Sequence, residues 1–446
     1  MYLHSLRLEK VKNFVELLDF RFDRPDRSYE GWNVFIGGNA SGKTTLLKAI
    51  ALALCGDEFG RVLLRNDFSG WVSEGAKKAR VIAEVQYDRD FDFFSSKGNV
   101  PRNPFKCGVR WEQPSKGNPT FARFEERTGK QTRVTHPKRG PWNENAAGWF
   151  SAGYGPMRRL TGSSAEAMHD AVGSGLVPRF ISLFREDVAL SESEIWLKNL
   201  QFKALEETGE ARRRANTLVK SIEGFLNDGL LPHGFQIDEI RSDHVYMKTT
   251  QGTILPMRDL SEGYRCVYGL MLDIIRNMAN VYGETQLFTR NSDNRMVADK
   301  PGILLIDEIE THLHPKWQQT ICTWLKQRFP KIQFLVTTHS PLIVQAADPG
   351  GIYFLPAPGE HRKAHRFDQH EYERIVLGRA EKILLGEAFG LDYTRGDWAL
   401  RQIDRYRHLA AKKRANALTS PAEKKEFNRL AQQMEMEFSE KTEMIA

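Results

Sequence analysis

The residues best suited to chemistry form one short run, Gly37-Gly38-Asn39-Ala40-Ser41-Gly42-Lys43-Thr44. The apolar run over 32–36 before it indicates a strand, and a helix is expected after it, to about Leu54. Glycines let successive backbone N–H groups converge on phosphate oxygens at the positive end of such a helix. We expect Lys43 to reach the β- and γ-phosphates of a nucleotide and Thr44 to hold Mg²⁺. A chance glycine turn before a helix is the alternative, which the strand–loop–helix order disfavours.

Two acidic residues follow a second apolar run at 303–306, which predicts a strand buried on both faces. They are Asp307 and Glu308, at the carboxyl end of that strand, where open parallel sheets bind ligands. We expect Asp307 to bind Mg²⁺ directly or through water, and Glu308 to orient and deprotonate the attacking water. A helix-starting turn with two acids is the alternative.

Three further polar positions could complete a phosphate site. His339 follows the predicted strand 332–336 and could sense the γ-phosphate, although a lone loop histidine is usually unremarkable. Ser261 and Gly263 open an apolar helix, so a hydroxyl, N–H groups and the helix dipole could meet an anion. Serine is also an ordinary N-cap. The predicted nucleotide-binding residues are therefore Gly37, Asn39, Ser41, Gly42, Lys43, Thr44, Thr45, Ser261 and Gly263.

His312 and His314 suggest a metal site, but no cluster of further ligands accompanies them in the sequence, so a metal is disfavoured. The four cysteines lack metal or pairing spacing, and we expect them to be reduced and structural.

Composition is that of an ordinary globular protein, with 41% hydrophobic and 27% charged residues in 446 positions. This length allows two or three packed units. No apolar run is long enough to span a bilayer, and the first residues lack a signal-peptide pattern, so we predict a cytoplasmic protein without membrane contact.

The net charge of +7 is modest, but basic residues gather between Lys97 and Gly140, where 11 Lys and Arg face 3 Glu. Aromatic residues interrupt this segment, namely Phe105, Trp111, Phe121 and Phe124. Basic side chains can neutralise phosphates and aromatic ones can stack on bases, so 97–140 is a candidate DNA surface. A hairpin with a solvated basic face is the equal alternative.

Patterning along the chain predicts four parts: an α/β head over 1–376, a β-rich basic subdomain within it at about 79–140, a helical insertion at about 165–230, and a helical region over 377–446. A glycine-rich turn followed by Arg158 and Arg159 has the chemistry of an anion- or nucleotide-sensing loop, with an ordered linker as the alternative.

Together these motifs resemble the ABC-type ATPase heads of the SMC, RecF and OLD branch. Asn39 and Ser41 look like that branch's form of the phosphate loop, 260–263 is similar to the ABC signature, 303–308 to the Walker B strand, and His339 to the switch histidine. The runs 307–315, 337–341 and 154–159 are similar to the PtuA ATPases of Septu and retron anti-phage systems.

The resemblance implies a P-loop head with a mixed sheet, flanking helices and an antiparallel β subdomain. It also implies slow hydrolysis of ATP with Mg²⁺, catalytic roles for Glu308, His339 and Lys43, and metal binding by Thr44 and Asp307. Two protomers, or a higher homo-oligomer, would enclose two ATPs, with Ser261 and Gly263 reaching the partner's nucleotide. In that family an HNH-type nuclease is the partner.

Departures from the family keep rivals open. No Q-loop glutamine is evident, since Gln86 lies in a predicted strand, and the loop 154–159 is the alternative for that role. A RecF-like DNA-repair ATPase without a toxic effector is the main rival. A transporter motor domain and a self-contained nuclease are further rivals, although no Toprim-like cluster of acids follows His339.

Overall fold

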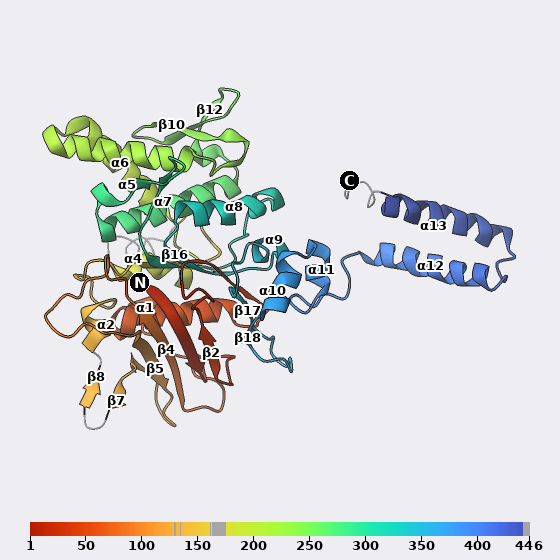
Figure 1. Cartoon of the computed structure of the whole chain (residues 1–446), viewed down its shortest axis with the longest axis horizontal. Helices are drawn as coiled ribbons and strands as arrows, with labels where there is room; N and C mark the ends of the chain where they lie inside the picture. The colour runs from red at the N-terminus through yellow and green to blue at the C-terminus, as the bar shows by residue number, and fades with distance from the viewer. Residues whose placement is uncertain (129–130, 134, 161, 163–174, 440–446) are drawn as a thin grey trace. The chain divides into compact units, whose positions relative to one another are not determined.

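The computed structural model describes residues 1–128, 131–133, 135–160, 162 and 175–439 (Figure 1). It divides into two units, Met1–Ile383 and Leu384–Ala446, each treated by itself below. Parts of three predicted regions lie outside the described residues: 129–130 and 134 of the basic segment, 161 and 163–164 beyond the two arginines, and 165–174 of the helical insertion. The predicted boundary at 376/377 stays a prediction.

A six-stranded sheet forms the centre of the first unit, in the order β18-β17-β3-β16-β15-β9. Its strands are parallel except for β18, which runs against β17. Consecutive apolar residues build the middle strands, which are buried on both faces. The strand bounds are β3 (Gly31–Ile36), β9 (Ser151–Tyr154), β15 (Gly302–Ile306), β16 (Ile332–Thr337), β17 (Ile352–Phe354) and β18 (His365–Arg366).

A second, antiparallel sheet has five strands in the order β2-β1-β4-β5-β6. Apolar residues alternate along these strands and face one side, as in Phe105, Cys107, Val109 and Trp111. The strand bounds are β1 (Tyr2–Glu9), β2 (Leu18–Arg21), β4 (Lys78–Gln86), β5 (Phe105–Glu112) and β6 (Thr120–Arg123).

Helix α1 (Lys43–Leu63) contacts strands of both sheets, and its apolar side chains join one continuous core with them. Burial on more than one side explains why this helix is apolar almost all round. It continues beyond the predicted end near Leu54, across a kink at Gly56, whose φ is +78°. Near the kink the indole N–H of Trp142 donates to the carbonyl of Ala53 at 2.9 Å.

Figure 1 labels the other helices that begin within the first unit, the last of which ends two residues beyond Ile383. Helix α4 packs on β9 and α1, whereas α5 packs on α6 and α7. Their bounds are α2 (Thr135–Arg139), α4 (Leu176–Phe184), α5 (Ser191–Glu206), α6 (Gly209–Asn227), α7 (Glu262–Tyr282), α8 (Pro315–Arg328), α9 (Pro341–Val344), α10 (Gln369–Val376) and α11 (Ala380–Leu385). Short strands complete it: β7 (Glu126–Thr128), β8 (Gln131–Arg133), β10 (Gln236–Ile240), β11 (Val245–Lys248), β12 (Ile254–Pro256), β13 (Thr289–Arg290) and β14 (Met296–Val297).

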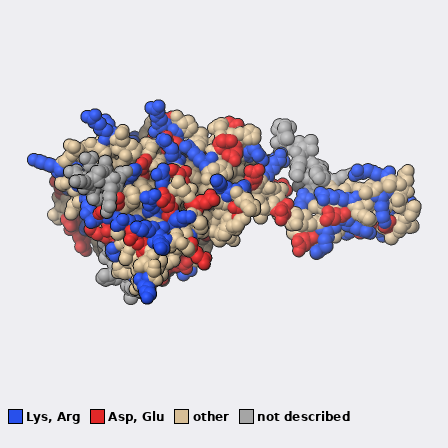
Figure 2. Space-filling view, turned by 90° about the horizontal axis from the view of Figure 1, so that it is seen from below, with Lys and Arg blue, Asp and Glu red and all other residues tan. Residues whose placement is uncertain are grey.

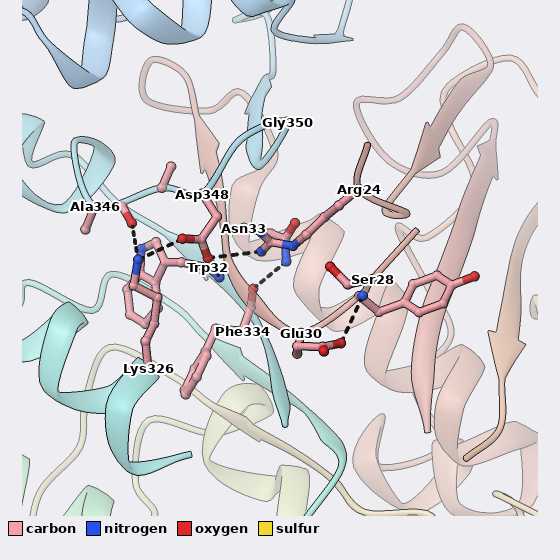
Figure 3. A network of polar contacts seen from close by, with 12 residues as sticks. Arg24, Ser28, Glu30, Trp32, Asn33, Lys326, Phe334, Ala346, Asp348 and Gly350 are labelled. Atoms are coloured by element: carbon pink, nitrogen blue, oxygen red, sulfur yellow. Dashed lines mark hydrogen bonds and ion pairs between the residues drawn. The ribbon is translucent and has the colours of Figure 1, made fainter. Parts of the chain in front are cut away.

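Asp348 anchors the start of β3, the strand that leads into the phosphate loop (Figure 3). Its carboxylate accepts the Trp32 amide at 2.7 Å and pairs with Lys326 at 2.8 Å and Arg24 at 3.1 Å. On the next residue, the Asn33 side-chain amide donates to the carbonyl of Phe334 in β16 at 3.1 Å. These contacts fix the register in which β3 reaches Gly37 beside β16.

The second unit contains a helical hairpin of α12 (Asp397–Arg414) and α13 (Pro421–Ser439). Its core consists of Leu409, Phe427 and Leu430, with Tyr406 stacked on Phe427. Two ion pairs, Arg405–Glu426 at 2.8 Å and Lys412–Glu423 at 2.7 Å, link the helices along one side.

The predicted fold class is confirmed: a mixed sheet with flanking helices, an antiparallel β subdomain, inserted helices and C-terminal helices.

Candidate nucleotide site

The phosphate loop connects β3 to α1 and takes a shape that requires glycine at two positions. A Cβ on Gly37 would lie 2.2 Å from the Leu355 carbonyl oxygen, so no side chain fits there. Gly42 has φ +90°, a left-handed conformation, and a Cβ there would lie 2.6 Å from the Asn13 side chain. The loop therefore turns sharply enough to bring its N–H groups to the start of α1.

Lys43 and Thr44 begin α1, with Thr45 in the same turn, while Asn39 is exposed on the loop. The Lys43 ammonium donates to the carbonyls of Gly37 at 2.9 Å and Gly38 at 3.0 Å. Burial lowers the pKa of Lys43, and nearby carboxylates, Asp307 first, oppose that shift. Lys43 is thus a buried cation that lies directly over the loop.

Asp307, at the end of β15, contacts the start of α1 although β16 lies between β15 and β3. Its carboxylate accepts the Thr44 hydroxyl at 2.6 Å on one oxygen and the Thr337 hydroxyl at 2.5 Å on the other. Thr337 ends β16, which lies between β3 and β15, and is fully buried. Thr337 was not among the predicted site residues, although its place at the end of the strand 332–336 was an available signal.

The backbone of Glu308 is in the left-handed region, with φ +44°. Such a conformation costs a non-glycine residue about 1–3 kcal/mol and persists only where its surroundings fix it. Here the Glu308 amide donates to the Thr337 hydroxyl at 2.8 Å. The Thr337 hydroxyl therefore holds both acidic residues: it binds the carboxylate of Asp307 and the backbone amide of Glu308.

His339 lies just beyond β16, and Glu310 determines its position. The Glu310 carboxylate accepts the Thr338 hydroxyl at 2.7 Å and also the His339 amide. Surrounding protein atoms, and then the charge of Lys43, lower the pKa of His339. The lowered pKa favours the neutral form of this solvent-accessible imidazole.

Ser261 and Gly263 lie elsewhere, at the start of α7, where Ser261 is the exposed N-cap residue. A Cβ on Gly263 would lie 2.4 Å from the carbonyl oxygen of His312, so α7 begins against the loop that follows Glu308. Among the residues that the structure describes, no hydrogen bond or ion pair joins these two positions to the phosphate loop.

His312 does have possible co-ligands, contrary to prediction. Glu262 and Cys266, from α7, offer ligand atoms within 4.8 Å of its own and of each other. The sequence could not show this because the two elements are about fifty positions apart. Burial raises the pKa of the Cys266 thiol, and Arg158 opposes that shift. The nearby arginine and the positive end of α7 both disfavour a second cation here. His314 instead caps α8, accepting the Lys316 amide at 3.3 Å.

The base-stacking role predicted for the aromatic residues of 97–140 is wrong for three of the four. Phe105, Trp111 and Phe121 are buried in the core, because they lie on the inner side of their strands. Lysines and arginines are interspersed with acidic residues over the face drawn in Figure 2. The exposed charges and the partly exposed Phe124 are left to support a DNA contact.

The predicted anion-sensing role of Arg158 is also not what its side chain does. Arg158 is buried and bonded to backbone carbonyls, while Arg159 is exposed. Gln86 lies in β4 and donates to the Tyr87 carbonyl at 2.9 Å, so its amide is engaged locally.

The donor set fits a Mg²⁺–nucleotide. The Thr44 hydroxyl and the Asp307 carboxylate are close enough together to bind one small, hard cation. In addition, the Ser41 hydroxyl is buried in the loop without a partner among the protein atoms described. Lys43, with its buried charge, can neutralise phosphate oxygens.

Fold and site together define the chain as a P-loop nucleotide-binding domain. The chain belongs to the family described as "AAA domain, putative AbiEii toxin, Type IV TA system", whose model matches residues 32–345.

Curated relatives agree with the predicted resemblance, which is confirmed. The chain is 25% identical over 397 residues to "Septu protein PtuA" of Bacillus mycoides (strain KBAB4), covering 87% of this chain and 46% of the relative. It is 31% identical over 164 residues to "Retron Vc95 probable ATPase" of Vibrio cholerae serotype O1 biovar El Tor, which covers 36% of this chain and 29% of the relative. The chain spans less than half of the curated relatives it matches.

Among solved structures, an SMC head bound to the C-winged helix domain of ScpA is 14% identical with a TM-score of 0.49, covering 83% of this chain and 99% of that one.

Across the part of the chain that the structure describes, every helix is too short or too polar to cross a membrane.

Proposed function

We propose that this chain binds and slowly hydrolyses ATP with Mg²⁺, as the ATPase subunit of a bacterial anti-phage defence system. The observation that supports this most directly is the 2.6 Å contact between Thr44 and Asp307, 263 positions apart in the sequence, beside Lys43. A hydroxyl, a carboxylate and a buried ammonium around a glycine loop can bind a nucleoside triphosphate and its Mg²⁺. The defence context comes from the relatives named for Septu and retrons.

In this proposal the residues of the nucleotide site have separate roles. Lys43 and the loop N–H groups bind the phosphates, and Thr44 and Asp307 would hold the Mg²⁺, which neutralises charge on the phosphate oxygens. Glu308 orients the attacking water and accepts its proton. His339, kept neutral, can donate a hydrogen bond toward the γ-phosphate.

The assembly state is the second part of the proposal. Among the described residues, no hydrogen bond or ion pair joins Ser261 or Gly263 to the phosphate loop, yet the exposed start of α7 can bind an anion. A second protomer would bring these residues to the first protomer's nucleotide, so dimerisation would depend on ATP. We propose that the ATP-dependent dimer regulates a partner nuclease of HNH type.

The first test measures phosphate release and molar mass together. The intact chain should hydrolyse ATP in the presence of Mg²⁺, and Glu308→Gln should reduce turnover at least ~100-fold while still binding ATP. By light scattering, Glu308→Gln with ATP should show a larger dimer fraction than with ADP. A Glu308→Gln variant that turns over like the parent would falsify the assignment of the base. Co-purification with the products of neighbouring genes then tests the nuclease, and a chain that emerges alone with DNA would favour the repair alternative.

A DNA contact through 97–140 rests on exposed charges such as those of Lys97, Arg102 and Lys116. Reversing these three charges should weaken DNA retention at low salt. Unchanged retention would exclude this surface.

A further inference from the structure

Arg158 is a buried arginine whose role the proposed function leaves open. Only 3% of its surface is exposed, just beyond the end of β9. Its Nη1 donates to the carbonyls of Gly155 at 2.9 Å and Asp307 at 2.7 Å. Its Nη2 donates to the carbonyls of Glu308 at 3.1 Å and Ile309 at 3.3 Å. One guanidinium thus binds three consecutive carbonyls of the acidic turn.

Those carbonyls point to one place because the chain turns sharply at Glu308, where φ is +44°. Three converging carbonyl dipoles repel one another and attract a cation. Arg158 supplies that cation from the side opposite Thr337, which accepts the Glu308 amide. The peptide groups on both sides of Glu308 are therefore fixed, and with them the direction in which its side chain leaves the backbone.

The chemistry of the contact requires arginine. A planar guanidinium offers N–H groups in a fixed fork, so its two terminal nitrogens can reach four acceptors. A lysine would place one compact ammonium there and could not span the carbonyls of both Gly155 and Ile309. Burial lowers the pKa of Arg158, but an arginine stays protonated in proteins, so the charge is permanent.

We propose that Arg158 is a positioning residue for ATP hydrolysis, which holds the turn at 307–309 so that the Glu308 carboxylate faces the attacking water. The proposal rests on the proposed function, since it assigns the base to Glu308. Arg158 itself touches no part of the nucleotide in this arrangement. It acts through the backbone of Asp307, Glu308 and Ile309.

The test separates kcat from nucleotide binding in the full chain. Arg158→Met should keep the Kd for ATP within about threefold of the parent but reduce kcat about 100-fold, since small misplacements of a reacting group can have that effect. Arg158→Lys should show the same loss, because charge without the fork does not rescue positioning. In the double variant with Glu308→Gln, kcat should fall no further than in Glu308→Gln alone.

Arg328 provides the matched control. It is also buried and donates to backbone carbonyls, of Met296 at 2.9 Å and Asp228 at 3.1 Å, but on α8 and away from the acidic turn. Arg328→Met should lower the melting temperature while kcat stays near that of the parent.

The proposal would be overturned if Arg158→Lys kept the kcat of the parent. It would also be overturned if the losses in kcat of the two single variants multiplied in the double variant. The absence of folded, ATP-binding protein for both Arg158 variants would likewise overturn it, because that result makes Arg158 a folding residue. If instead the parent lacks turnover, or Glu308→Gln has no effect, it is the proposed function that fails.

Discussion

Replacing Thr337 by valine tests how the acidic pair is held. The change keeps the shape of a fully buried side chain and deletes one hydroxyl. That hydroxyl donates to Asp307 at 2.5 Å and accepts the Glu308 amide at 2.8 Å, so two interactions are lost at once. A hydrogen bond to a charged group contributes about 1.5–3 kcal/mol and a buried unpaired amide costs about 1–3 kcal/mol.

Because the two losses share one atom and the site can relax, we expect Thr337→Val to lower the free energy of unfolding by about 2–4 kcal/mol. Turnover should fall about 10–100-fold, as Asp307 and Glu308 lose their common anchor. Thermal unfolding and phosphate release against Mg²⁺ concentration measure the two effects, and a higher Mg²⁺ requirement should accompany them. Thr337→Ser keeps the hydroxyl and should turn over within about threefold of the parent. The reasoning is refuted if valine and serine variants behave alike.

Three further predictions concern other parts of the molecule. Ser41→Ala removes a buried, unpartnered hydroxyl, so thermal stability without nucleotide should stay unchanged or rise, while the Kd for ATP rises about tenfold in a fluorescent-nucleotide titration. Lys43→Met should weaken ATP binding ~100-fold or more and yet stabilise the nucleotide-free chain. Burial lowers the pKa of Lys43, so the folded state disfavours its charge. As pH rises through that lowered pKa toward 10.5, Lys43 loses its proton first in the folded state, and the parent gains stability. The difference in free energy of unfolding between Lys43→Met and the parent, measured by chemical denaturation, should therefore shrink over this pH range. Leu430→Ala should destabilise the α12–α13 hairpin by about 2–4 kcal/mol, giving faster hydrogen exchange there and unchanged ATP turnover.

The sequence predicted the strand–loop–helix around Lys43 and the buried strand before Asp307 because both are local. Four adjacent apolar residues followed by two acids have few alternatives, and β15 ends at Ile306 as expected. For the aromatic residues of 97–140 the sequence left base stacking and a solvated hairpin as equal alternatives, for a physical reason. Phe105 and Trp111 lie in a segment that alternates in burial, the pattern of a half-buried strand. In an exposed hairpin, the same spacing would place both rings on one solvent-facing side, where a base could stack on them. Which side of the sheet faces a core depends on α1, far away in the chain.

Residues expected to touch the nucleotide and residues that hold those in place differ in how the sequence encodes them. Most of the first group lies in two short runs, at 37–45 and 307–308, because a phosphate must meet several groups of one loop, whereas Ser261, Gly263 and His339 lie apart from them. The second group is dispersed, since Arg158 and Thr337 reach the acidic turn from neighbouring strands on either side of β15. No spacing rule connects position 158 to 308, and only the parallel order β16-β15-β9 brings them together. Both neighbouring strands supply such a partner to the left-handed Glu308. Exchanging either partner should therefore impair the base while leaving the fold of the phosphate loop intact.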